Sequence, residues 1–211
     1  KVLEDSNSFL TVQKKNKILK KYSELICGSR NQNRLYSMQP ISAEVQHITD
    51  KIPNKYSVTD KADGEKFSLV ISNGLLYLLS CNMNVRLLDI KIDGIKDCIL
   101  EGELIHISSQ RKYLYMIFDC LYYNGVDIRS DVSLKNRLEK AYNICKKLGM
   151  NIYQNKEYSG KFDLKLIKNF YQNEINNFYN NLNNSLLKLK DNDIFFHPKM
   201  FLFPSGGSDS E

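Results

Sequence analysis

The pattern of apolar and polar residues divides the chain into a helical beginning, a β-rich middle and a mostly helical remainder. Near the beginning, Ile18, Tyr22 and Ile26 recur at helical spacing, and Gly28 is a natural stop. The lysines of "QKKNKILKK" fall mostly on the other face of this helix. That face either meets solvent or binds RNA. A polar connector follows the helix and ends in an extended segment led by a proline.

The pattern changes to β between Tyr56 and Tyr123. "KFSLVIS" and "LLYLLS" flank Asn73-Gly74, which is a strong signal for a tight hairpin. "VRLLDIKI", "DCILEGELIHI" and "RKYLYMIFDCLYY" follow, separated by turn residues. We therefore expect one antiparallel sheet built from successive hairpins.

The remainder of the chain is predicted to be helical until its last strand. "SLKNRLEKAYNICKKLGM" has one apolar helical face, with Asp131 or Ser133 as the cap and Gly149 as the stop. A second helical run spans roughly 162–189, and its many asparagines predict breaks or irregular ends. The tail, "DIFFHPKMFLFPSGG", is expected to form a strand followed by a loop. The fold class is thus α+β, an antiparallel sheet flanked by helices.

Composition narrows the function only slightly. The 211 residues carry a formal net charge of +6, which suits a polyanionic partner such as nucleic acid or nucleotide phosphates. The five cysteines lack CxxC spacing, and the three histidines are isolated, which favours free thiols in a reducing compartment and gives no zinc site. No stretch approaches the ~20 apolar residues of a membrane span. Because there is no initiator Met and the chain stops in a loop-like run, we expect a piece of a longer polypeptide.

"TDKADGEKFSLVI" contains the first candidate for chemistry. Lys61 and Asp63 alternate onto one side just ahead of a strand, and Gly64 lets the backbone come close to a ligand phosphate. A lysine amine becomes a nucleophile when burial, a nearby cation or a metal lowers its pKa. Four-residue matches also arise by chance, and Asp-Gly is an ordinary turn. This segment alone therefore does not decide whether Lys61 is a nucleophile or an ordinary surface lysine.

Two further segments add carboxylates and an aromatic ring. "ILEGELI" places Glu101 and Glu103 on one side of a strand, where they suit a divalent metal or ribose hydroxyls unless that side faces solvent. "YLYMIFDCLYY" places Phe118 beside Asp119 in a very apolar run. An aromatic ring there can stack on a base, and a buried acid needs a partner.

The order and spacing of these three segments resemble the covalent nucleotidyltransferases, which comprise mRNA capping guanylyltransferases and ATP-dependent DNA and RNA ligases. "KADGEK" is similar to their first motif, "LEGELI" to the third, and "YMIFDCLYYNGVDIRSDVSLKNRLEKA" to the block called IIIa. "SMQPISAE" and "TDKADGEKFSL" most resemble guanylyltransferases of large cytoplasmic DNA viruses. The resemblance implies an ATP-grasp-like nucleotidyltransferase domain over residues 41–211, preceded by a helix and connector over residues 1–40.

The resemblance also implies a reaction and its participants. Lys61 would attack the α-phosphate of GTP, and the resulting lysyl-GMP would pass to a 5′-diphosphate RNA end, with Mg²⁺ or Mn²⁺ as the cofactor. Glu103 would be the metal-side carboxylate, and Phe118 would stack on guanine, with Tyr115 as the alternative. The remaining nucleotide-side residues would be Asp63, Gly64, Lys66, Arg86, Glu101, Asp119 as a structural or metal-side acid, and Lys199 on the base or phosphate side. Triphosphatase and methyltransferase domains are expected on the same polypeptide, in the cytoplasm, a viral factory or a virion.

The chain departs from the family pattern at its carboxyl end. The glycine of the D-G-L-I-like fourth motif is missing from "DNDIFF", and the "KLK" at residues 188–190 lies in a helical context rather than in the fifth motif. We therefore expect motifs IV and V and an OB domain beyond residue 211, and an isolated piece that binds nucleotide weakly. Three alternatives remain: a ligase with a lysyl-AMP intermediate, a tunnel-type RNA triphosphatase, which needs two Glu-x-Glu strands, and a non-catalytic RNA-binding module.

Overall fold

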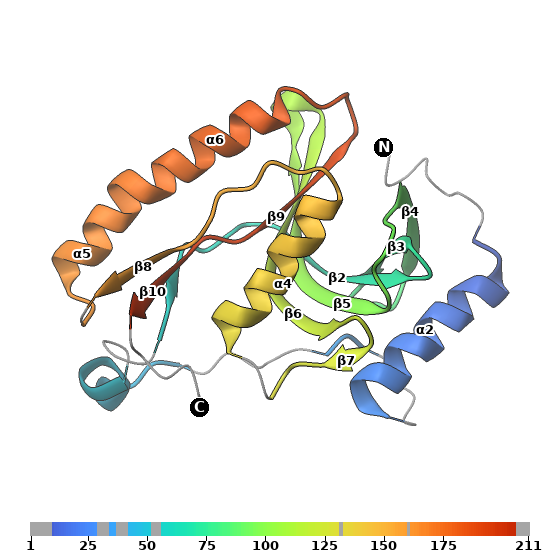
Figure 1. The fold of residues 1–211 in the computed structure, drawn as a ribbon, viewed down its shortest axis with the longest axis horizontal. Coiled ribbons are helices and arrows are strands. Elements are labelled where there is room, and N and C mark those ends of the chain that lie inside the picture. Colours follow the sequence, from blue (N-terminus) through green and yellow to red (C-terminus); the bar gives the residue numbers. More distant parts are fainter. Residues whose placement is uncertain are drawn as a thin grey trace.

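The computed structural model describes residues 10–28, 34–36, 42–51, 56–130, 133–159 and 161–205. A mixed sheet of seven strands lies at the centre, in the order β4-β3-β2-β5-β6-β7, with β9 beside β6 (Figure 1). Its strands are β2 (Glu65–Ser72), β3 (Leu75–Ser80), β4 (Val85–Lys91), β5 (Cys98–Ile107), β6 (Lys112–Tyr123), β7 (Val126–Asp127) and β9 (Ile194–Pro198). A second sheet combines β1 (Val58–Thr59), β10 (Phe201–Ser205) and β8 (Lys156–Ser159) in the order β1-β10-β8.

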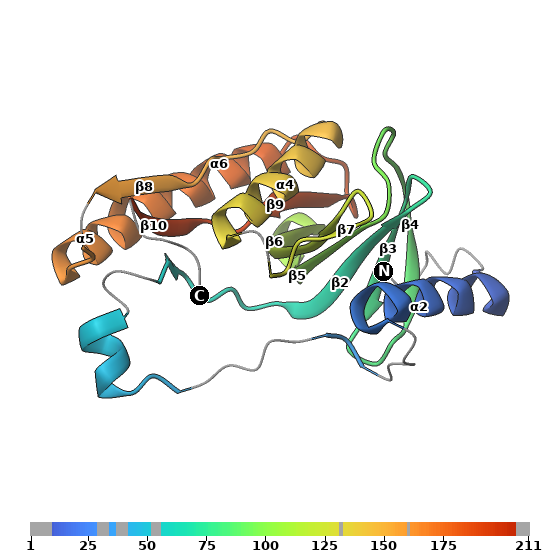
Figure 2. The ribbon, with the colours of Figure 1, turned by 60° about the horizontal axis from the view of Figure 1, so that its bottom comes forward.

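Helices cover both faces of the central sheet. The α-helices are α2 (Val12–Cys27), α4 (Leu134–Lys147), α5 (Leu164–Asn169) and α6 (Asn176–Leu186). Shorter turns are the π-helical η1 (His47–Lys51) and η3 (Phe170–Ile175) and the 3-10 turn η2 (Ser108–Gln110). Figure 2 shows α4 above the strands and α2 below them. None of the helices formed by the described residues is long and apolar enough to cross a membrane.

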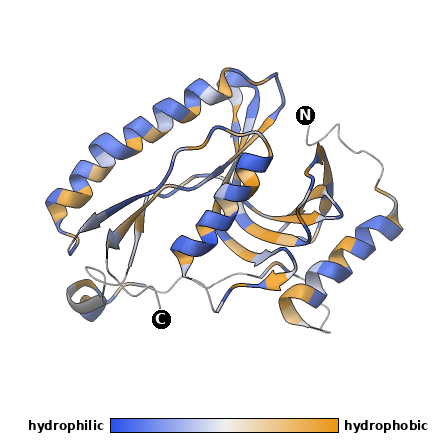
Figure 3. Ribbon diagram, in the orientation of Figure 1, coloured by the Kyte–Doolittle hydropathy of each residue, from blue (hydrophilic) through white to orange (hydrophobic). Residues whose placement is uncertain are grey.

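The alternation of side chains along β2 explains this layering. Leu69 and Ile71 point into one core with α4, and Val70 points into another with Ile18 and Tyr22 of α2. A third core lies beneath α5, η3 and α6, where Phe170 and Phe178 are buried. Figure 3 shows the apolar residues gathered on the central strands, while the helices are largely hydrophilic along their outer sides.

The main predicted elements are confirmed. Asn73 and Gly74 both have positive φ, as the predicted hairpin turn requires, and they join β2 to β3. The Ser133 hydroxyl caps α4 by accepting a hydrogen bond from the Asn136 amide at 3.2 Å. The alternative cap, Asp131, and much of the polar connector lie outside the described residues. The asparagine-rich run has the predicted irregularity, because π-helical η3 separates α5 from α6.

The antiparallel sheet predicted from the β-rich middle is confirmed, since β2, β3, β4, β5 and β6 pair antiparallel with their neighbours. The structure adds a strand to it that was not predicted there, because β9 pairs with β6 in parallel, with Tyr115 opposite Phe196. One prediction is wrong. The tail is not a strand followed by a loop: "FLFPS" forms a second strand, β10, which pairs with β1 and β8. Local patterns could not show either feature, because each depends on a partner strand far away in the sequence.

Candidate active site

Lys61 lies in the loop that leads from β1 into β2, and its side chain is exposed. Two tyrosines from the helical layer hold the residues just before it. The Tyr171 hydroxyl donates to the carbonyl of Thr59 at 2.8 Å, and the Tyr179 hydroxyl donates to Oδ2 of Asp60 at 2.5 Å. The loop is therefore fixed on one side while the lysine itself remains free to meet a substrate.

The other side of this loop runs against β5. A Cβ atom added at Gly64 would lie 2.9 Å from the carbonyl oxygen of Leu104 and 2.9 Å from Cγ1 of Ile105. The glycine thus serves a close approach to the neighbouring strand, in addition to any approach to a phosphate. The side chain of Asp63, immediately before it, is exposed.

A lysine and two glutamates share one face of the sheet beyond the loop. The register places Lys66 opposite Glu103 and Ser68 opposite Glu101, and directly opposed residues point to the same side. The Lys66 ammonium lies 3.3 Å from Oε1 of Glu101. Glu101 is only 2% exposed, and its burial raises the pKa of the carboxyl group, although Lys66 acts in the opposite direction. The predicted pairing of Glu101 and Glu103 on one side of a strand is confirmed.

Oε1 of Glu101 accepts no hydrogen bond from the described residues either, but it has Lys66 as an ion-pair partner, whereas Glu103 has none among them. Its Oε2 atom is buried and accepts no hydrogen bond from the described residues. A buried carboxylate oxygen without a donor suits a bound cation. Mg²⁺ typically takes one or two carboxylates and completes its shell with water and substrate phosphates. The described residues contain no cluster of three or more potential metal ligands, so Glu103 fits a metal that is shared with a substrate.

The glycine between the two glutamates makes room for an aromatic ring. A Cβ atom at Gly102 would lie 2.6 Å from Cζ of Tyr115. Tyr115 is fully buried, and its hydroxyl donates to the carbonyl of Phe67 at 2.9 Å. Tyr115 therefore belongs to the core and cannot stack on a ligand, which corrects the prediction that it is an alternative to Phe118.

Phe118 is displaced from the regular pairing of β6. Glu101 pairs with Asp119 and Gly102 with Ile117, so that Phe118 is the extra residue of a β-bulge. The ring is partly exposed, and the Lys66 ammonium lies 5.7 Å from its centroid. The bulge thus brings an aromatic surface to the same lysine that contacts Glu101.

Asp119, the next residue, is held by α4. Arg137 donates from Nε to Oδ1 at 2.7 Å and from Nη2 to Oδ2 at 3.2 Å, and the Cys120 amide donates to Oδ1 at 2.7 Å. Both carboxylate oxygens therefore have protein partners. Of the two predicted roles for Asp119, this geometry favours the structural one.

Lys199 lies in the short connection between β9 and β10. Its amide donates to the carbonyl of Ile117 at 2.6 Å, beside Phe118, and the side chain is only 7% exposed. Thr59 pairs with Phe201, so the same connection also lies beside the segment that leads to Lys61. Among the described residues no hydrogen bond or ion pair of its ammonium is seen. Lys199 thus lies between the lysine loop and the aromatic bulge.

Arg86 lies apart from these residues. The register places Arg86 on β4 opposite Leu78, and Leu78 is opposite Leu69. Both leucines belong to the core under α4, on the other face of the sheet from Lys66. The structure does not bring Arg86 to the acid pair, and its role in nucleotide binding stays a prediction.

Sequence reasoning missed the residues that support this site. Tyr171, Tyr179 and Arg137 come from helices that are far from Lys61 and Asp119 in sequence, and no local motif marks them. Tyr22 of α2 is fully buried, and Glu101 is among the charged groups that contribute to its raised pKa, although burial is the largest cause. The presence of an acid, Asp119, in an otherwise apolar run was the one available signal, since a buried acid needs a partner.

A lysine on an anchored loop, an acid pair on the adjoining strand and an aromatic ring beside them form the arrangement that the sequence predicts for a nucleotidyltransferase domain. Comparison with known proteins specifies the family. Residues 4–199 match the mRNA capping enzyme catalytic domain, and the chain belongs to this family. It is also 33% identical over 217 aligned residues to the "Probable mRNA-capping enzyme" of Acanthamoeba polyphaga mimivirus. That match covers 100% of this chain but 18% of the mimivirus protein.

Proposed function

We propose that the protein is an mRNA guanylyltransferase, which transfers GMP from GTP through a covalent lysyl-GMP intermediate to the 5′-diphosphate end of RNA. One observation supports this most strongly. The lysine of the family's first motif is exposed on an anchored loop that enters β2, and β2 pairs directly with the strand carrying Glu101 and Glu103. A nucleophile and a carboxylate pair are thereby held on adjoining elements.

The first step forms a phosphoramidate. Lys61, once deprotonated, attacks the α-phosphorus through Nζ; a P–N bond forms, the bond to the bridging oxygen breaks, and pyrophosphate leaves. The second proton lost from the amine passes to solvent. In the second step a terminal phosphate oxygen of the RNA attacks the same phosphorus and releases Lys61. Holding the lysine loop with Tyr171 and Tyr179 limits the positions from which Nζ can attack.

The other residues bind and orient the nucleotide. Phe118 offers its ring to the base, and Lys199, beside it, can donate to a base acceptor. Guanine presents acceptors at O6 and N7, whereas adenine has an amino donor at the corresponding position. A lysine donor near the base would therefore favour GTP over ATP. Lys66, ion-paired with Glu101, faces the ribose or phosphates. A divalent metal held by Glu103 would neutralise charge on the phosphates.

The covalent intermediate gives a direct test. The full-length protein is incubated with [α-³²P]GTP or [α-³²P]ATP and Mg²⁺, and radioactivity that survives denaturation is measured. We expect labelling from GTP, its complete loss in Lys61→Ala, and full labelling in the control Lys91→Ala, which removes an exposed lysine from β4. Labelling from ATP alone would instead indicate a ligase. No labelling of the full-length protein would indicate a non-catalytic module.

The length of the mimivirus protein bears on the neighbours of this domain. Because the matched region is 18% of that protein, we propose that this domain also functions within a longer polypeptide. Triphosphatase and methyltransferase domains are the neighbours that would prepare and complete the cap. The same labelling assay on residues 1–211 alone should give much weaker labelling than the full-length protein, since we propose that further phosphate-binding lysines lie outside them.

A further inference from the structure

Helix α2 carries a row of lysines that the proposed chemistry does not use. Its buried side is formed by Ile18, Tyr22 and Ile26, which pack on the sheet. Lys14, Lys17 and Lys20, here called the lysine stripe, follow at intervals of three residues and are all exposed. Within the described residues Lys14 and Lys17 form no ion pair, and Lys20 faces only the exposed Glu24 at 3.7 Å. Such an exposed pair contributes little, so the positive charge of the stripe is little compensated by the residues that the structure describes.

The position of these lysines does not favour the helix itself. The helix macrodipole favours acids in the first turn and cations in the last. In α2 the first turn has no acid and contains Lys14, and the last turn has no cation. Helix α4 shows the favourable arrangement, with Lys146 and Lys147 in its last turn. Lys14 therefore opposes the helix dipole, and a negatively charged partner would account for its position, whereas Lys17 and Lys20 lie in the middle of the helix, beyond the reach of this effect.

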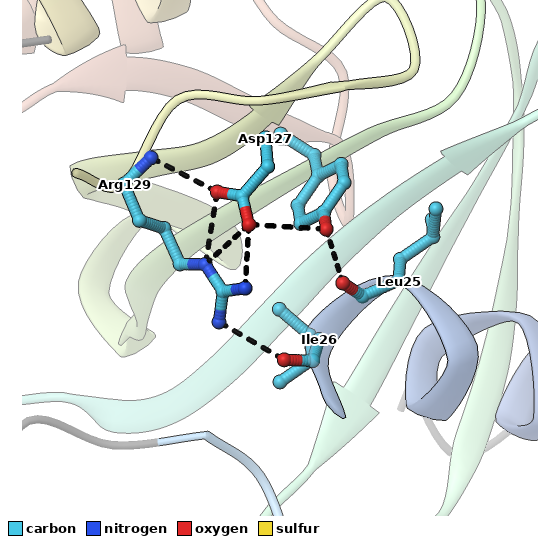
Figure 4. Close-up of polar contacts among 5 residues, drawn as sticks. Leu25, Ile26, Asp127 and Arg129 are labelled. Carbon is cyan, nitrogen blue, oxygen red and sulfur yellow. Dashed lines mark hydrogen bonds and ion pairs between the residues drawn. The ribbon is translucent and has the colours of Figure 1, made fainter. Parts of the chain in front are cut away.

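The helix is held firmly where it meets the sheet. Figure 4 shows Arg129 donating from Nη1 to the carbonyl of Ile26 at 3.1 Å, while Tyr122 donates to the carbonyl of Leu25. Asp127 orients Arg129 by accepting from Nε at 3.0 Å and from Nη2 at 2.6 Å. These bonds satisfy carbonyls at the carboxyl end of α2 that the helix cannot satisfy. A helix fixed in this way can present charges at constant positions.

The stripe and the acid pair lie on the same face of the sheet. Val70, which packs with α2, is on the same side of β2 as Lys66. Lys21, beside the stripe, donates to the hydroxyl of Ser72 at 2.9 Å and contacts Asp97 at 2.5 Å, and Tyr22 approaches Ser68, so α2 contacts β2 from its middle to its carboxyl end. Lys61 precedes the other end. The seven steps between the first and last residues of β2 separate its two ends by about 23 Å.

From this arrangement we infer that the lysine stripe of α2 binds the backbone of the RNA whose 5′ end is presented to Lys61. The inference rests on the proposed function. A stacked single strand spaces its phosphates by about 3.4 Å along its axis, as one strand of a duplex does, so about seven nucleotides cover the length of β2. RNA of about four nucleotides would occupy the reactive end without reaching the stripe. The contacts are with phosphates and carry no base preference.

The test compares two variants with the same change in charge. Lys14, Lys17 and Lys20 are changed to Gln together, which lowers the net charge from +6 to +3. The control changes the exposed Lys146, Lys165 and Lys168 to Gln and gives the same net charge. Binding of 5′-diphosphate RNA of 4 or 25 nucleotides to the full-length protein is measured over a range of KCl concentrations. Labelling by [α-³²P]GTP is measured in parallel, without RNA.

We expect the stripe variant to bind the 25-nucleotide RNA about tenfold more weakly at low salt, with a salt slope smaller by about two. Its binding of the 4-nucleotide RNA and its labelling by GTP should match those of the wild type. Equal binding of the long RNA by the stripe variant and the wild type would overturn the inference, as would an equal loss in the control variant. Loss of GTP labelling in the wild type would overturn the proposed function instead, so the two failures are distinguishable.

Discussion

Two carboxylates on neighbouring strands, Asp119 and Glu103, differ in the hydrogen-bond donors that surround them. Asp119 receives two hydrogen bonds from Arg137 and one from the Cys120 amide, all between 2.7 and 3.2 Å. Glu103 has a buried Oε2 atom that accepts no hydrogen bond from the described residues. Both were candidates for the nucleotide side on sequence grounds. Their surroundings separate a carboxylate that holds the protein together from one that is available to a ligand.

The physical basis of this difference is the cost of burying charge. A buried carboxylate without donors destabilises the protein, and it persists only where function requires it. Glu101 is intermediate, since it is buried like Asp119 but is met only by Lys66 at 3.3 Å within the part of the chain that the structure describes. The comparison therefore predicts that substitutions at Asp119 affect stability, those at Glu103 affect chemistry, and those at Glu101 affect both.

The largest effect is expected from breaking the ion pair between Asp119 and Arg137. Each side chain is 12% exposed, so Arg137→Met leaves a buried carboxylate without its cation. We expect a loss of about 3–5 kcal/mol in the free energy of unfolding, measured by urea denaturation. The double variant Asp119→Asn with Arg137→Met removes the charge but keeps an acceptor for the Cys120 amide. It should recover much of this loss, and an equally unstable double variant would show that the charge is not the cause.

The next effect is expected at Glu103. Glu103→Gln keeps the shape of the side chain but removes its charge, so a cation and the phosphates that share it are bound less well. We expect labelling by GTP to slow about 100-fold, with the free energy of unfolding unchanged or slightly increased. Raising the concentration of Mg²⁺ or Mn²⁺ should restore part of the rate. A variant that labels as fast as the wild type would exclude Glu103 from the metal and phosphate side.

The part of the site that could be predicted from sequence is the part built from consecutive residues. Asn73-Gly74 specifies a hairpin through its backbone preferences, and Glu101-Gly102-Glu103 specifies two acids on one side of a strand through alternation. The family resemblance then assigned roles to these residues, and the family is confirmed. Local pattern and motif order were sufficient there because the strands pair with their neighbours in sequence.

The remaining part depends on contacts between distant segments. The parallel insertion of β9 beside β6 is encoded by no local signal, yet it brings Lys199 to Ile117. The bulge at Phe118 arises where the register between β5 and β6 shifts by one residue, between Glu101 and Gly102. The partner of Asp119 lies on α4. Such features follow from how whole elements pack, and single-sequence patterns do not contain that information.

A smaller effect with a distinctive pH dependence is expected at Glu101. Burial raises the pKa of its carboxyl group above the ordinary value of 4.5. Between the unfolded and folded pKa values the folded protein binds more protons than the unfolded chain, so Glu101 reduces stability progressively as pH rises through that interval. Glu101→Gln removes this penalty. The variant should therefore be more stable than the wild type above the interval, with the difference shrinking as pH falls toward 4.

The measurement at Glu101 is urea denaturation from pH 4 to 8, with GTP labelling at pH 7.5. A stability difference that does not change with pH would show that Glu101 is not the buried acid described. Labelling by Glu101→Gln should fall less than labelling by Glu103→Gln, because Glu101 already has Lys66 as its partner. An equal fall would remove the distinction between the two glutamates.

The smallest effect on labelling is expected at Tyr171, whose hydroxyl holds the loop before Lys61. Tyr171 is 37% exposed, and its hydroxyl donates to the carbonyl of Thr59 at 2.8 Å, just before Lys61. Tyr171→Phe removes one hydrogen bond, worth about 0.5–1.5 kcal/mol, from a loop that Tyr179 still holds. We expect labelling by GTP to slow by about two- to threefold, with KM for GTP nearly unchanged, since the loop positions Nζ rather than the nucleotide. Tyr158→Phe on β8 is the matched control, because no hydrogen bond of its hydroxyl is seen among the described residues, and it should label at the wild-type rate. If both variants label equally fast, Tyr171 supports the fold alone and the lysine loop is positioned without it.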